Sequence, residues 1–446
     1  MKTFRTLLLT ILTAALLMPA VATPAAADAL TPVVLFPAYH FNILEVWVLG
    51  QTEFPECPAW GTYEVWFPNP SPSETFSQEC QDKLMSLVVD PDTSKPLARR
   101  FSNQPRVLVL KKHYSRTESS PFYEPLYAFL ESHGWERNHN IRVAGYDARL
   151  TPDMNWFVER TKLLIEATYY GNGNTPVHLV GHSNGPLYAQ YLLTHTSQAW
   201  KDKYIHGFTP LAGNWAGQGL LYALYFTGLN LNDFSFPADA ASAAASAARY
   251  ATQPSSYMST ADPDFFTNQE IVLRDASTGT EYTPMDALQL FADAELTLAQ
   301  ELAPHYLGFV EFEPPAFPNV DVYAEKGSGL PTPVGIELPD LDVGYVVTGG
   351  EEFFIRDGDA NQEDLTNDAV EVWQTMPCFR VEITDNVGVD HFALASDPGV
   401  LDRLLTNLGR PRSVCPGHPG SGFLREAWDD KSGDSPPDPD PPGRPR

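Results

Sequence analysis

The chain of 446 residues has few basic residues, few cysteines and no Asn-x-Ser/Thr acceptor for N-linked sugar. Lys and Arg number 29 against 56 Asp and Glu, so the formal net charge is −27 at pH 7. A surface of this sign repels nucleic acid and anionic membranes, which excludes nucleic acid as a partner. The four cysteines match no zinc-binding spacing, and we expect neither a metal site nor another cofactor.

The longest apolar run lies at the N-terminus. Lys2 and Arg5 precede the apolar residues 7–18, and three alanines follow at 25–27. This layout is typical of a secretory signal peptide, and the run is too short for a membrane span, which needs about 20 residues. We predict that residues 1–27 are removed and that the protein is secreted, either outside the cell or into a lumenal or periplasmic compartment. An uncleaved anchor is the alternative.

The cysteine count also fits an exported protein. An even number of cysteines in an exported protein predicts two disulfide bonds. Four cysteines allow three pairings, and proximity in the chain favours Cys57–Cys80 and Cys378–Cys415.

Short apolar runs alternate with amphipathic segments along the chain. Strand-like runs occupy residues 33–36, 106–110, 177–180, 320–323 and 379–383, and helical patterns occupy 122–133, 154–169, 186–196 and 400–408. The runs are nearly all apolar, which is typical of strands buried on both sides. This alternation predicts an α/β fold whose mostly parallel sheet is flanked by helices.

Two segments interrupt the alternation. We predict one domain over residues 28–430, in which residues 51–84 form a lid-like insertion and residues 216–310 a cap insertion above the sheet. Ordinary packing elements are the alternative for both. Residues 431–446 form an acidic, proline-rich tail that cannot bury a core, and we expect this tail to be disordered.

The pentapeptide at residues 181–185 is the strongest chemical motif. Gly181-His182-Ser183-Asn184-Gly185 fits G-x-S-x-G, the nucleophile elbow of the α/β-hydrolase fold. A strand-like run precedes it and a helical pattern follows it, as the elbow requires. We therefore predict that Ser183 is a nucleophile; a strand-to-helix turn with a capping serine is the alternative. We interpret His182 as a packing residue.

A serine hydroxyl needs a base, and in this fold the acid and then the histidine follow the serine along the chain. His391 lies between the run at 379–383 and the helical pattern at 400–408, where the fold places its base. The acid belongs to a loop near residues 357–364, and chain order leaves Asp357, Asp359 and Asp364 open.

An oxyanion hole needs two backbone N–H groups. The residue after the nucleophile, Asn184, supplies the first, and the loop at residues 37–39 after the first strand supplies the second.

The chain resembles the lecithin:cholesterol acyltransferase family, and more closely its lysosomal phospholipase/acyltransferase branch. The resemblance runs from about residue 32 to residue 408 and depends on several blocks, which are residues 32–37, the pair Cys57 and Cys80, and residues 146–149, 199–205 and 329–333. Such long blocks are more specific than the pentapeptide alone.

The resemblance implies roles for particular residues. The family's Gly-Asp-Gly-Thr-Val loop falls on residues 358–362, which makes Asp359 the acid, and its Gln/Glu-His-Leu-Asn falls on residues 390–393, which supports His391. Tyr39 takes the place of the second oxyanion donor. Cys57 and Cys80 match the disulfide of the family's membrane-binding lid. Ala324 replaces a family cysteine, which again pairs Cys378 with Cys415.

The resemblance also implies an activity. It predicts a serine hydrolase and O-acyltransferase that cleaves a fatty-acyl ester of a glycerophospholipid and passes the acyl group to water or to a small lipid alcohol. The expected partner is a phospholipid or lipid-particle surface, bound through apolar contacts because of the acidic charge. A plain lipase or carboxylesterase without transferase activity, and a non-catalytic lipid-binding protein, are the alternatives. Trp47, Trp60 and Trp66 are candidates for the lipid interface or an acyl groove.

Overall fold

A computed structural model describes residues 30–66, 75–230, 235–266, 270–314, 316–349, 351–413 and 415. The predicted signal peptide at 1–27 and the predicted tail at 431–446 lie outside these residues.

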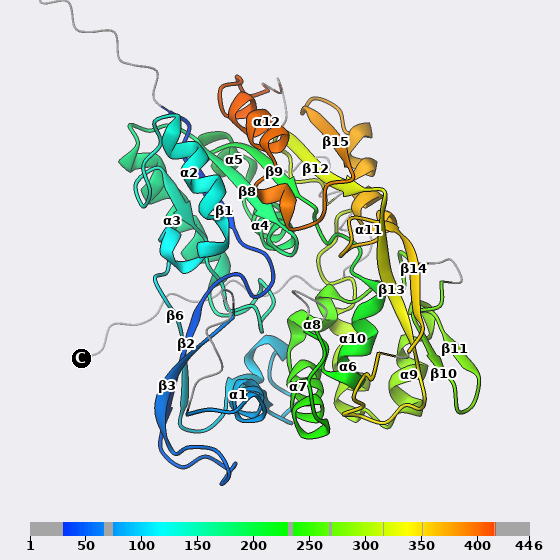
Figure 1. Cartoon of the computed structure of the whole chain (residues 1–446). Helices are drawn as coiled ribbons and strands as arrows, with labels where there is room; N and C mark the ends of the chain where they lie inside the picture. The colour runs from blue at the N-terminus through cyan, green and yellow to red at the C-terminus, as the bar shows by residue number, and fades with distance from the viewer. Residues whose placement is uncertain are drawn as a thin grey trace, which may run out of the picture.

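A parallel sheet forms the upper part of the molecule in Figure 1. Within the described residues its order is β15 (Val381–Val387), β12 (Val322–Ser328), β9 (Ile205–Leu211), β8 (Val177–His182), β1 (Val33–Phe36) and β7 (Ile141–Val143), and every neighbouring pair is parallel. All side chains of β1 and β8 are buried, because helices cover both faces of the sheet.

Alternate side chains of β1 enter two separate cores. Val33 and Leu35 pack with residues of α2 (Glu124–Ser132) and α12 (Pro398–Leu408). Val34 and Phe36 pack with residues of the helices that cover the other face, α3 (Phe157–Gly171), α4 (Gly185–Thr194) and α5 (Gln198–Tyr204). The three layers, with a sharp turn between β8 and α4, are those of the α/β-hydrolase fold, as the sequence predicts.

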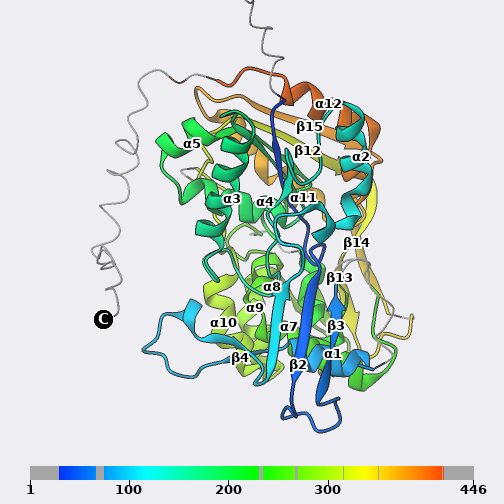
Figure 2. The ribbon, with the colours of Figure 1, turned by 90° about the vertical axis from the view of Figure 1, so that its left-hand side faces the viewer.

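A second group of elements lies below one edge of the parallel sheet in both views (Figures 1 and 2). Its helices are α1 (Gln78–Met85), α6 (Leu224–Thr227), α7 (Ala240–Thr252), α8 (Pro254–Ser259), α9 (Ala287–Asp293) and α10 (Thr297–Tyr306). A four-stranded sheet runs beside them in the order β11 (Thr280–Tyr282), β10 (Leu273–Asp275), β13 (Leu330–Leu338) and β14 (Phe353–Gly358). Strands from outside residues 216–310 therefore complete the sheet of the segment proposed as a cap. Two smaller features are α11 (Asp364–Asp368) and the antiparallel pair β4 (Leu87–Val89) and β5 (Phe101–Asn103).

One predicted core strand belongs to a different sheet. The run at 106–110 forms β6 (Val107–Lys111), which pairs antiparallel with β2 (Leu44–Leu49), and β2 in turn pairs with β3 (Trp60–Val65). Its placement in the parallel sheet was wrong because only one face of the strand is covered. Val107 packs in the core of the small sheet, whereas Leu108 and Leu110 on the outer face are 40% and 37% exposed.

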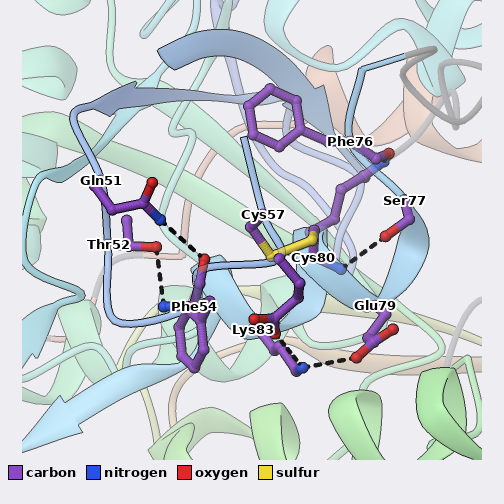
Figure 3. The surroundings of a disulfide bond; sticks show 11 residues. Gln51, Thr52, Phe54, Cys57, Phe76, Ser77, Glu79, Cys80 and Lys83 are labelled. Carbon is purple, nitrogen blue, oxygen red and sulfur yellow. Dashed lines mark hydrogen bonds and ion pairs between the residues drawn. A yellow bond between two sulfur atoms is a disulfide. The ribbon is translucent and has the colours of Figure 1, made fainter. Parts of the chain in front are cut away.

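Both disulfide bonds join the pairs that chain proximity favours. Cys57–Cys80 ties the loop after β2 to α1, whose first turn is capped by Ser77: its hydroxyl accepts a hydrogen bond of 3.2 Å from the Cys80 N–H (Figure 3). Cys378–Cys415 ties the segment before β15 to the chain after α12. None of the described helices is long and apolar enough to cross a bilayer.

Candidate active site

Ser183 lies in a strained turn between β8 and α4. Its φ of +59° is in the left-handed region, which non-glycine residues rarely adopt. The Ser183 N–H donates to the Leu211 carbonyl at 2.9 Å, and the Ser183 carbonyl accepts from the Asn214 N–H at 3.0 Å. These bonds to the chain after β9 hold the turn, which places the serine at the carboxyl end of a central strand.

The two glycines of the motif permit close packing of strand and helix. A Cβ on Gly185 would lie 2.0 Å from the Phe36 carbonyl oxygen, and one on Gly181 would lie 2.8 Å from the Pro186 nitrogen. Neither contact is possible for a real side chain. The motif therefore contains glycine at both positions for steric reasons, independent of any chemistry.

His391 and Asp359 form a buried pair. Nδ1 of His391 lies 2.9 Å from Oδ2 of Asp359, and the His391 N–H donates to the Asp359 carbonyl at 2.8 Å. The other carboxylate oxygen of Asp359 accepts from the N–H groups of Asn361 and Gln362 at 3.0 and 2.6 Å. Of the three carboxylates that chain order left open, Asp359 is thus the one in contact with the imidazole. Asn367 of α11 donates to its Oδ2 at 3.2 Å.

The serine and the imidazole line one small cavity. This cavity of about 20 Å³ is lined by Tyr39, Ser183, Asn184, Asn214, Ser259 and His391, among others. Nε2 of His391 faces no hydrogen-bond partner within the described residues although it is buried. A neutral imidazole oriented by a carboxylate at Nδ1 has a free acceptor at Nε2, which is the group that a nearby hydroxyl requires.

Two backbone donors border the same cavity. In the part of the chain that the structure describes, neither the Tyr39 N–H nor the Asn184 N–H forms a hydrogen bond. Two contacts fix the Asn184 side chain, since it donates to Oγ of Ser259 in α8 at 2.5 Å and accepts from Asn214 at 2.8 Å. The Tyr146 hydroxyl, which donates to the Pro37 carbonyl at 2.6 Å, holds the loop that carries Tyr39. These donors can bind a negatively charged oxygen in the cavity.

His182 connects the loop that carries Ala38 and Tyr39 with the loop that carries His391. Its interpretation as a packing residue did not predict this connection. The Ala38 N–H donates to the Tyr123 hydroxyl at 2.8 Å, and that hydroxyl lies 3.0 Å from Nδ1 of His182. Nε2 of His182 lies 2.9 Å from the His391 carbonyl. Burial, and next the neighbouring His391, hold the pKa of His182 well below its usual range, so it is neutral. Tyr123 then donates to Nδ1, and Nε2–H donates to the carbonyl.

Across the described ranges, no group of three or more His, Cys, Asp or Glu residues is placed to hold a metal ion.

Comparisons with known proteins agree with the sequence. The family model for lecithin:cholesterol acyltransferase matches residues 107–277. The chain is 25% identical over 308 residues to a phosphatidylcholine-sterol acyltransferase of Gallus gallus, covering 66% of this chain and 70% of that protein. It is 28% identical to a lysosomal phospholipase A and acyltransferase of Bos taurus, covering 64% of this chain and 67% of that protein.

Among solved structures, a chain of the Tle4-Tli4 complex superposes with a TM-score of 0.47 at 11% identity, covering 85% of this chain and 98% of that chain. The sequence relationship is much the more specific result. The resemblance inferred from the residue blocks is therefore confirmed: the chain is similar to lecithin:cholesterol acyltransferases over about two thirds of its length.

Proposed function

We propose that this protein is a secreted serine hydrolase and O-acyltransferase that cleaves a fatty-acyl ester of a glycerophospholipid. The observation that carries the proposal is the single cavity shared by Ser183 and His391, in which Nε2 of His391 is free and Nδ1 is bonded to Asp359. Relatives named as phospholipid-using acyltransferases support the substrate class. The two disulfide bonds fit an oxidising compartment.

The proposed reaction has two acyl transfers through a Ser-Asp-His triad. His391 takes the Ser183 proton while the serine oxygen attacks the ester carbonyl carbon. The N–H groups of Tyr39 and Asn184 bind the resulting oxyanion. The bond to the leaving alcohol then breaks, and His391 returns the proton to the departing lysophospholipid. Water or a lipid alcohol attacks the acyl-serine in the same way, with His391 taking its proton, and Ser183 is regenerated.

An exposed apolar face supports docking on lipid. Trp47, Leu49 and Trp60 on the outer face of the β3–β2–β6 sheet are 38%, 46% and 69% exposed, next to Leu108 and Leu110. Trp47 is the cross-strand neighbour of Leu108, and Leu49 that of Trp60. Aromatic side chains of this kind enter the polar–apolar boundary of a membrane. Trp66, by contrast, stacks on His40 at 4.3 Å between ring centres beside the site.

A covalent probe tests the catalytic assignment. We expect a fluorophosphonate to label Ser183 of the intact protein, and Ser183→Ala to abolish both labelling and release of fatty acid from phosphatidylcholine vesicles. Adding a long-chain alcohol to the vesicles should yield its acyl ester as well. If only free fatty acid forms and no acylated alcohol, the protein is a plain phospholipase without transferase activity. Absence of labelling and turnover would leave a lipid-binding protein.

A further inference from the structure

A second, larger cavity adjoins the proposed catalytic cavity. Its volume is about 530 Å³, and Phe41 and Phe392 line both cavities. This size is in the range of pockets that bind small ligands. It lies where α1 and α7 face each other, beside the loop that carries His40. A molecule whose ester bond is at Ser183 can therefore extend past the two phenylalanines into this space.

The lining of the cavity contains both apolar and charged side chains. Phe41 and Phe122 stack at 4.4 Å between ring centres beside Phe392 and form the apolar part. The charged part is Arg249 of α7 with Asp82 of α1, 2.6 Å apart between Nε and Oδ1. A cavity that binds an acyl chain alone gains nothing from a buried ion pair, which costs desolvation energy.

The Arg249 guanidinium also contacts Tyr250, with Cζ 4.1 Å from the ring centre, and yet it is only partly satisfied. Its exposed fraction is 7%, yet its Nη1 has no hydrogen-bond partner in the described part of the chain. The Asp82 carboxylate, in contrast, also accepts from Gln78 at 2.8 Å and from the Ser246 hydroxyl. A guanidinium is always charged and presents N–H groups in a fixed fork. Leaving one of these N–H groups unpaired in a buried place is costly, so an acceptor on a bound molecule would stabilise this edge.

His40 adds a second unpartnered nitrogen to the same cavity. Its side chain is 3% exposed, and its Nε2 has no partner within the described residues. Burial, and then the Arg249 guanidinium, hold the pKa of His40 well below its usual range. The neutral imidazole leaves the positive charge of the cavity on Arg249.

We propose that this cavity is the head-group subsite of the enzyme, in which Arg249 binds the phosphodiester of the substrate. A phosphodiester supplies charged acceptor oxygens to the free Nη1 edge, and its glycerol side faces Phe41 and Phe392, the two residues that the cavity shares with the one at Ser183. The proposal rests on the proposed function, because it needs an ester bond at Ser183. It makes Arg249 a residue that selects phospholipid over neutral glyceride.

The test compares two soluble esters with the same acyl chains, so that membrane docking does not enter. For the full-length protein, kcat/KM is measured on monomeric dihexanoyl phosphatidylcholine and on dihexanoylglycerol. We expect Arg249→Gln to lower the ratio of kcat/KM on dihexanoyl phosphatidylcholine to kcat/KM on dihexanoylglycerol. The expected fall is roughly 10- to 100-fold, as for the loss of a charged hydrogen bond. An unchanged ratio, with both rates falling together, would overturn the proposal, because it would mean that Arg249 only ties α7 to α1.

Arg149→Gln is the matched control. Arg149 and Asp147 form another buried ion pair, 2.7 Å apart, and Arg149 does not line the large cavity. Its replacement should lower both rates without changing their ratio; a change as large as that of Arg249→Gln would also overturn the proposal.

A second measurement keeps the proposal testable if Arg249→Gln does not fold. Glycerophosphocholine should competitively inhibit dihexanoylglycerol hydrolysis by the unaltered protein, and Arg249→Lys should weaken this inhibition, since lysine lacks the fork. No competitive inhibition would overturn the subsite alone. A protein that cleaves neither ester and takes no fluorophosphonate label would overturn the proposed function and the subsite together.

Discussion

The nucleophile and base positions follow from local sequence and chain order. The pentapeptide, the strand before it and the helix after it locate Ser183, and His391 is the histidine between the last strand and the last helix. The acid does not follow in this way, because three carboxylates lie in one short loop. Family resemblance chose Asp359, and the structure shows its contact with His391.

Residues that act through the tertiary structure could not be found in the sequence. His182 touches Tyr123 and His391, which are remote in the chain, and nothing local distinguishes it from a packed histidine. Arg249 lies in an alanine- and serine-rich helix, α7, and its partner Asp82 lies in α1, far away in the chain. Their importance is visible only when the cap elements and the sheet are placed together.

At His182 we expect a positioning role that kinetics can reveal. His182→Leu leaves the Tyr123 hydroxyl and the His391 carbonyl without their partner, so both loops lose a restraint. Because small displacements of catalytic groups are costly, kcat on a soluble short-chain ester should fall by up to roughly 100-fold with little change in KM. His182→Gln keeps an N–H donor and should recover part of kcat. Equal activity of His182→Leu and the unaltered protein would contradict this role.

At the scale of elements, the sequence predicted the parallel sheet but not the small ones. The runs at 33–36, 177–180, 320–323 and 379–383 all contribute to the parallel sheet, and the first three are buried on both faces. The run at 106–110 has the same composition, yet its outer face is exposed. Periodicity cannot distinguish an apolar face that packs on helices from one that is available to lipid.

The connection from β14 to α11 contains a buried carboxyl that makes stability depend on pH. Burial, and next the nearby Glu270, raise the pKa of Glu363 from its ordinary 4.5 to about 8. Glu270 has its own partner, Arg356, at 2.5 Å, so the proton remains on Glu363. The folded state thus binds this proton more tightly than the unfolded state does. Its stabilising contribution is complete below about pH 4.5 and is lost as the pH rises toward 8.

We therefore expect the Tm to fall by at least a few degrees between about pH 5 and pH 8, a range set by the Glu363 pKa. Glu363→Gln carries no titrating proton and should flatten this decline, with the largest gain over the unaltered protein at alkaline pH. Melting curves by circular dichroism across this pH range measure the fall in Tm. Glu311 is exposed, so Glu311→Gln is a control in which the Tm should fall with pH as in the unaltered protein. An unaltered slope in Glu363→Gln would show that the carboxyl is ionised in the folded protein.

For the whole molecule, net charge and the apolar face of the small sheet act in opposite directions. A net charge of −27 repels anionic lipid over a distance that salt shortens to about 10 Å at 0.1 M. The exposed side chains on β2, β3 and β6 gain free energy on any lipid surface they reach, whatever its charge. The proposed docking is therefore most favourable on zwitterionic surfaces, where electrostatic repulsion of the acidic protein is weakest.

This balance predicts how vesicle composition and the exposed tryptophans control the rate. The double change Trp47→Ser and Trp60→Ser should lower the rate on phosphatidylcholine vesicles, relative to that on monomeric dihexanoyl phosphatidylcholine, by roughly tenfold or more, because two exposed anchors are lost. Trp156→Ser removes an equally exposed tryptophan, 69% like Trp60, at the start of α3 and should leave this ratio unchanged. Anionic lipid added to the vesicles should slow the unaltered protein at low salt, and added salt should restore the rate. Faster turnover on anionic vesicles, or the same loss from Trp156→Ser, would mean that the molecule meets lipid through a different surface.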